Sequence, residues 1–94
     1  MSRERLSESD VTARLETLSG WMRRNETIVR RYEFLNFSEA LEFVNRVGEI
    51  AENFDHHPDI TFGWGYAEIL FTTHDAGGLT ALDFDLAGKV DEIR

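Results

Sequence analysis

The sequence predicts an α+β two-layer sandwich in which helices cover one face of an antiparallel sheet. Apolar residues recur with helical spacing near the start, in the middle and at the end of the chain. Between these stretches lie two segments rich in aromatic and β-branched residues, each divided by a short turn. The resulting order is helix, two strands, long helix, two strands, helix. With 94 residues, we expect one compact domain spanning 1–94.

The first half of the chain begins with a short helix and a hairpin. A capping box at 7–10 begins the helix, and Gly20 ends it. Its apolar stripe consists of Val11, Leu15 and Leu18. The segments 21–24 and 27–34 then flank a turn at Asn25-Glu26, which is the pattern of a β-hairpin.

The long central helix is the element that the sequence predicts most directly. Asn36 can cap it, with Glu39 three residues later, and it must end before Pro58 because the residue preceding a proline avoids helical geometry. Apolar residues recur through it at helical spacing: Phe37, Ala40, Leu41, Val44, Val47, Ala51 and Phe54.

The last third of the chain predicts two more strands and a closing helix. Residues 60–73 are interrupted by Gly63 and Gly65, as a bent pair of strands would be. After a glycine turn at 77–78, Thr80 and Asp83 form another capping box. The stripe that follows is Leu82, Leu86, Val90 and Ile93. An uncovered sheet edge invites pairing, so we expect dimers built by sheet extension.

Composition and net charge argue against several classes of function. The net charge of −8 argues against direct binding of nucleic acid, and no stretch of about 18 apolar residues predicts a membrane span. Residues 1–10 do not read as a secretory signal, so the cytoplasm is the expected compartment. The chain has no cysteine, which excludes disulfides, thiolate metal ligands and a cysteine nucleophile.

Histidine carries the remaining chemistry. His56 and His57 follow the long helix, and His74 follows the last predicted strand. Histidine titrates near neutral pH, so several in one site can donate and accept protons without large pKa changes. Pro58 should hold His57 in an extended conformation. Acid–base catalysis is the natural use of such a cluster.

Without a comparison to known families, the histidines, Asp83 and Glu52 each have an alternative interpretation. The histidines could be structural. A zinc site of imidazoles and a carboxylate is the main rival, although adjacent residues of an extended chain point in opposite directions and no helical His-x-x-x-His pair exists. Asp83 could serve only the capping box, and Glu52 could be an exposed helix residue.

The spacing of seven residues resembles the signature of the pterin-4a-carbinolamine dehydratase family. These residues are Glu52, His56, His57, Pro58, Trp64, His74 and Asp83. The similarity extends over about residues 6 to 93. It implies a four-stranded antiparallel sheet with three helices on one face, and a dimer or tetramer.

The resemblance also implies a reaction. Members of the family remove water from 4a-hydroxytetrahydropterin to give quinonoid dihydropterin, which allows the pterin cofactor of aromatic amino-acid hydroxylases to be recycled. A proton must reach the leaving 4a-hydroxyl and another must leave ring nitrogen N5, and no metal or redox cofactor is required. By position, His56 and His74 would be the acid–base pair and His57 would bind and orient the substrate.

The resemblance assigns supporting roles to four more residues. Glu52 and Asp83 would orient imidazoles, Pro58 would be a rigid support, and Trp21 would form part of an apolar wall for the flat pterin. Some members of the family act instead as dimerisation cofactors of a transcription factor or as assembly factors. A non-catalytic interaction protein is therefore the alternative reading of this chain.

Overall fold

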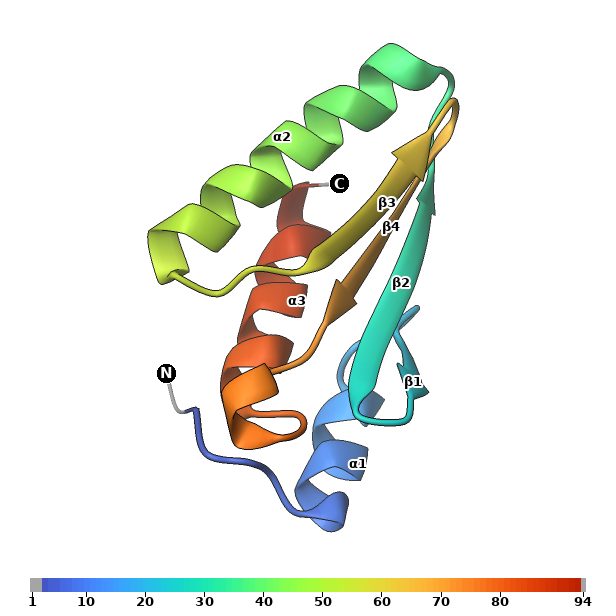
Figure 1. Ribbon diagram of the computed structural model, residues 1–94. Helices are drawn as coiled ribbons and strands as arrows, with labels where there is room; N and C mark the ends of the chain where they lie inside the picture. Colours follow the sequence, from blue (N-terminus) through green and yellow to red (C-terminus); the bar gives the residue numbers. More distant parts are fainter. Residues whose placement is uncertain (1–2, 94) are drawn as a thin grey trace.

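The computed structural model describes residues 3–93, and within them it confirms the predicted order of elements. The elements are α1 (Glu8–Glu16), β1 (Met22–Arg24), β2 (Thr27–Glu33), α2 (Phe37–Phe54), β3 (Asp59–Gly63), β4 (Tyr66–Phe71), a short 3₁₀ turn η1 (His74–Ala76) and α3 (Ala81–Ile93). Figure 1 shows α2 lying obliquely across α3, with the sheet alongside both helices. The chain is thus an α+β protein with a helical layer on an antiparallel sheet.

The described strands form one antiparallel sheet in the order β1-β2-β4-β3. Its register pairs Ile28 with Phe71 and Ile60 with Ile69, and all four of these side chains pack into the hydrophobic core. The alternate residues point away from the core, where Arg31 pairs with Glu68. One face of the sheet therefore carries the helices and the other is more polar.

Helix α2 begins and ends where the sequence predicts. The side chain of Asn36 accepts a hydrogen bond from the Glu39 N–H (2.9 Å), and Asp55 ends the helix in the left-handed conformation (φ 50°, ψ 45°). Its buried residues are Ala40, Phe43, Val47 and Ala51. The apolar stripe predicted from spacing does not coincide with the buried face. Leu41 belongs to the stripe but is exposed, whereas Phe43 lies outside the stripe but is buried.

Helix α1 is shorter than predicted, since it ends at Glu16 rather than near Gly20. The Thr17 hydroxyl donates to the Arg14 carbonyl (2.7 Å), which satisfies a free acceptor at the end of the helix. At its other end, Arg23 of β1 donates to the Glu8 carboxylate (2.6 Å), and this hydrogen bond holds the pKa of Glu8 below its ordinary value. Val11 attaches α1 to the common core.

The side chain of Asp91, near the end of α3, accepts hydrogen bonds from three side chains in two other segments. The Trp21 indole N–H donates to both of its oxygens (3.1 and 3.0 Å), Arg30 donates to Oδ1 (3.1 Å), and the Tyr32 hydroxyl donates to the same oxygen. Arg30 also donates to the Ser19 carbonyl (2.9 Å). This carboxylate fixes α3 against β2 and the loop before β1.

Replacing Asp91 by asparagine should lower the free energy of unfolding by about 2 kcal/mol, because an amide offers one acceptor oxygen and turns two donors toward the donors already present. Urea unfolding followed by circular dichroism measures the loss. The matched control is Glu92→Gln, an exposed carboxylate one residue further along the same helix, which should change stability by less than about 0.5 kcal/mol. Equal losses in the two variants would contradict a structural role for Asp91.

Candidate active site

The two adjacent histidines lie in the bend that follows α2 and have opposite environments. The left-handed Asp55 turns the chain, and the His56 N–H donates back to the Ala51 carbonyl (3.1 Å). His56 is buried, with 6% of its surface exposed, whereas His57 is exposed. Pro58 follows in the connection to β3. The extended chain thus sends one imidazole into the protein and the other toward solvent.

A fully buried carboxylate holds His56. The Oδ1 atom of Asp83 lies 2.5 Å from His56 Nε2, while Oδ2 accepts from the Thr73 hydroxyl (2.8 Å) and from the Thr80 N–H (3.0 Å). Asp83 has no exposed surface. Burying an ionised carboxylate is costly unless donors surround it, and here donors reach both oxygens. The predicted capping-box contact is therefore present, and the same carboxylate also holds an imidazole.

The Asp83 carboxylate fixes which nitrogen of a neutral His56 ring carries the proton. An ionised carboxylate can only accept, so the proton of a neutral His56 ring is on Nε2 and its lone pair is on Nδ1. Because the single Thr73 hydroxyl proton goes to Asp83, the Thr80 hydroxyl must be the donor in the 2.9 Å bond between the two threonines. On the other side of the ring, Phe71 lies nearly parallel, with centroids 6.0 Å apart and planes at 10°. The His56 ring is therefore held by Asp83 at its edge and by Phe71 at its face.

His57 and Glu52 form a second pair on the surface. Glu52, in the last turn of α2, contacts His57 Nε2 through its carboxylate. The two side chains are 77% and 55% exposed, so solvent weakens the interaction between them. The contact orients His57 without burying it.

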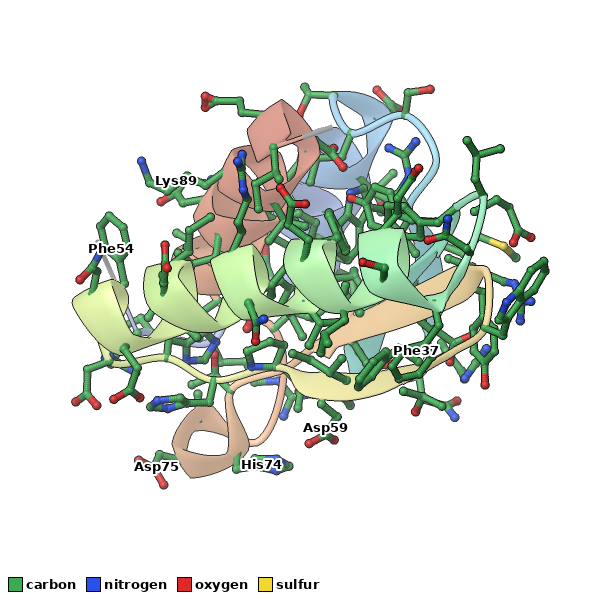
Figure 2. The ribbon with its side chains drawn as sticks, turned by 90° about the horizontal axis from the view of Figure 1, so that it is seen from above. Phe37, Phe54, Asp59, His74, Asp75 and Lys89 are labelled. Carbon is green, nitrogen blue, oxygen red and sulfur yellow. The ribbon has the colours of Figure 1, made fainter. Side chains whose placement is uncertain are left out.

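His74 completes the group as the first residue of η1, separated from the end of β4 by Thr72 and Thr73. Figure 2 shows its side chain pointing outward beside Asp75, below the sheet. His74 is exposed, yet it lines the same depression as His56 and His57, with a volume of about 240 Å³. Its other lining residues are Arg3, Asp55, Thr72, Thr73 and Asp75. Two segments that are distant in the sequence thus bring the three histidines to one hollow.

Two larger depressions, of about 430 and 850 Å³, lie along α2, and neither is lined by a histidine. Their walls come from residues such as Glu39, Arg46 and Asn53, and both are wide open to solvent. Volume alone would select one of these two depressions as the candidate active site. The chemistry favours the smaller hollow, because proton transfer needs titratable groups within reach of one bound molecule.

Not every residue of the predicted set reaches the hollow. Trp21 is buried behind it, with its ring 6.0 Å from the Phe71 ring that supports His56, and it does not line the hollow. Trp64 occupies the turn between β3 and β4, at the opposite end of these strands from His57, and is 73% exposed. Asp83 does not line the hollow, but it bonds His56 and Thr73, which do.

Sequence reasoning gave no role to the five other residues that line the hollow, of which Thr73 and Arg3 contact the buried pair of Asp83 and His56. Thr73 lay in the segment that resembled the family, but nothing in its spacing indicated a bond to Asp83. Arg3 lies outside every predicted element, and its Nη1 is 3.4 Å from His56 Nδ1.

Among residues 3–93, no three His, Asp or Glu side chains are arranged so that they could hold a metal ion. No helix of that range is long and apolar enough to cross a membrane.

Fold and site together define a class of small α+β proteins in which a buried carboxylate orients one of several clustered histidines. A sequence model of the family described as Pterin 4 alpha carbinolamine dehydratase matches residues 4–93, and the chain belongs to this family. A curated relative from Thermomicrobium roseum is 46% identical over 89 residues, which are 95% of this chain and 96% of the relative. Another, from Rubrobacter xylanophilus, is 57% identical over 77 residues, which are 81% of this chain and 72% of the relative. Both are provisionally named as pterin-4-alpha-carbinolamine dehydratases.

Solved structures show the same fold. A Brucella melitensis protein described as a transcriptional coactivator/pterin dehydratase superposes with a TM-score of 0.91 at 34% identity, covering 96% of this chain and 98% of its own. A pterin dehydratase-like protein described as a RuBisCO assembly factor in the alpha-carboxysome gives 0.64 at 19% identity, covering 78% and 84%. The second likeness concerns the fold alone. Among known proteins, this fold accompanies more than one role.

Thr73→Val should destabilise the protein by about 1–3 kcal/mol, because it removes a hydroxyl donor from a fully buried carboxylate while keeping the side-chain shape. Chemical unfolding measures the loss. Thr12→Val is the matched control, since the Thr12 hydroxyl donates only to the Glu8 carbonyl on an exposed helix surface (3.0 Å). A loss no larger than that of the control would show that Asp83 does not depend on Thr73.

Proposed function

We propose that this protein dehydrates 4a-hydroxytetrahydropterin to quinonoid dihydropterin by histidine acid–base catalysis. The observation that carries the proposal is the convergence of His56, His57 and His74 on one hollow, with His56 oriented by the buried Asp83. Membership of the dehydratase family supports the choice of a pterin substrate. We further infer a cytoplasmic protein that serves the recycling of tetrahydropterin.

The reaction suits such a site because it needs only one proton donor and one proton acceptor and no change of oxidation state at the protein. The C4a–O bond breaks and its oxygen leaves as water after taking a proton from a general acid. The N5–H proton passes to a general base, and its electron pair forms the N5=C4a double bond. One group loses a proton and another gains one, so exchange with water restores both. Two imidazoles on opposite sides of a small ring system can carry out these transfers, with typical gains of about 10²–10⁴ over the uncatalysed rate.

The geometry supports distinct roles for the histidines. His56 has one nitrogen committed to Asp83 and one lone pair left, so we assign it to proton transfer together with His74, which faces solvent and can exchange protons freely. His57, held by Glu52, would orient the substrate. Pro58 would keep the His57 backbone extended. Trp21, behind Phe71, would support the wall of the hollow rather than form its surface.

His56→Ala and His74→Ala should each lower kcat/KM for the dehydration by about 10²-fold or more, because each removes one proton-transfer group. The assay generates 4a-hydroxytetrahydropterin in situ and follows its loss spectroscopically against the spontaneous reaction. Asn45→Ala, an exposed position on α2 away from the hollow, should retain the wild-type rate. Added chelator should change nothing.

Two results would contradict the proposal. A wild-type rate no faster than the spontaneous one would favour the alternative function, a non-catalytic interaction protein. Activity that chelator abolishes would point instead to a metal-dependent reaction.

We also propose that the protein is a homodimer or homotetramer. An apolar tip, formed by Leu35, Phe37 and Trp64, remains exposed at the end of the sheet far from His57. The Phe34 N–H donates to the Gly65 carbonyl (2.8 Å), which brings Leu35 beside the β3–β4 turn that carries Trp64. Exposed apolar side chains that gather in this way are typical of contact surfaces.

Trp64→Ser should weaken self-association by about tenfold or more, because a large aromatic surface would lose its partner. Sedimentation over a range of concentrations measures the change. Met22→Ser is the matched control, since Met22 is 70% exposed on the opposite edge strand β1 and should have little effect. A wild-type protein that stays at 10.9 kDa at all concentrations would contradict the proposed oligomer.

A further inference from the structure

Arg3 reaches over the hollow from the N-terminal arm, which we define as residues 3–6. Its Nη2 donates to the carbonyl of Asp55 (2.8 Å) and more distantly to that of Phe54 (3.4 Å), while Nη1 is 3.4 Å from Nδ1 of His56. It is the one arginine or lysine among the described residues that line the hollow. A guanidinium therefore stands at the entrance, in contact with the imidazole assigned to proton transfer.

The arm is anchored just after Arg3. The Leu6 N–H donates to the Leu79 carbonyl (2.8 Å), and Arg5 forms an isolated antiparallel bridge with Thr80. The Arg5 side chain also donates to Glu26 (2.9 Å). The segment that holds the arm is thus the one whose Thr80 N–H binds Asp83. Because the anchor lies two residues away, Arg3 is restricted to the neighbourhood of the hollow.

The contact with Nδ1 has a direct consequence for catalysis. Since Asp83 occupies Nε2, Nδ1 is the remaining nitrogen through which His56 can exchange a proton with a substrate. In the free protein Arg3 donates to that lone pair. A substrate must take the place of Nη1 at His56, and the displaced guanidinium edge then needs another acceptor nearby.

We propose that Arg3 is a substrate-binding residue, an inference that rests on the proposed function. When the pterin enters, Nη1 leaves His56 Nδ1 and donates to the C4 carbonyl oxygen of the ring, next to the carbon that loses its hydroxyl. Nη2 keeps its bond to the Asp55 carbonyl, so the guanidinium pivots rather than detaches. Arginine suits this exchange because its rigid fork presents five donors and no acceptor.

A purely structural role for Arg3 makes a different prediction. Helix α2 has no basic residue in its last turn, and its final carbonyls attract a cation, so Arg3 could serve only as a cap for this helix. Loss of a cap lowers stability. It leaves the affinity of folded protein for a pterin unchanged, and this difference separates the two roles.

The test compares Arg3→Met and Arg3→Lys with Arg46→Met, in the full chain, by steady-state dehydration of 4a-hydroxytetrahydropterin. Arg3→Met should raise KM by about tenfold with kcat within about twofold, because one charge-assisted hydrogen bond to the bound ring is lost. Arg3→Lys should restore part of the loss. Arg46→Met, an exposed arginine of α2 that pairs with Glu42 and lies outside the lining of the hollow, should keep the wild-type KM.

A binding measurement separates failure of this inference from failure of the proposed function. Fluorescence titration with 7,8-dihydropterin, which keeps the C4 carbonyl but has no 4a-hydroxyl to lose, should show about tenfold weaker binding to Arg3→Met whether or not the protein turns over. Three results would overturn the inference. The first is an unchanged dihydropterin affinity in Arg3→Met. The second is tighter binding or a lower KM in Arg3→Met, which would make Arg3 an obstruction. The third is an equal loss in Arg46→Met. Absence of wild-type turnover would reject the proposed function alone.

Discussion

Asp83 is a carboxylate with no surface in contact with water, and its charge can stay there only if donors from elsewhere in the chain reach it. They come from the segment after β4 through Thr73, from the residue before α3 through Thr80, and from the bend after α2 through His56. Each of these segments is irregular in its own right. The hydrogen bonds to this buried carboxylate therefore connect the segments that line the hollow. The same bonds offset the free-energy cost of burying the charge, and one of them orients the His56 imidazole.

Much of the fold follows from local rules that act on neighbouring residues. Asn36 and Pro58 bound α2 because a cap and a proline restrict only a few backbone angles, and Asn25 marks its turn for the same reason. Spacing was less reliable for the width of a buried face, since it could not tell that Leu41 faces solvent at the edge of the stripe. It was silent on Arg3, whose contact with His56 joins positions 53 apart without any periodic signal.

The site shows the same division between local and long-range information. Adjacent positions in an extended chain predicted that His56 and His57 would face opposite ways, and they do. Membership of a signature did not predict nearness: Trp64 shares the family spacing with the histidines but lies at the far turn of the sheet. Because a likeness at 19% identity accompanies a protein described as an assembly factor, the fold alone cannot decide the role of this chain. That decision rests on the chemistry of the hollow.

The separation of the Asp83 partners along the chain affects the order of folding. His56 lies 27 residues from Asp83, and Thr73 lies 10 residues from it, so the cluster cannot form within a single helix or hairpin. Closing such loops costs chain entropy that is recovered only once α2, β4 and α3 have docked. An intermediate with its hairpins and α2 already formed would still lack an oriented His56. An oriented His56 therefore depends on contacts between distant segments, and the proposed activity would report that these contacts have formed.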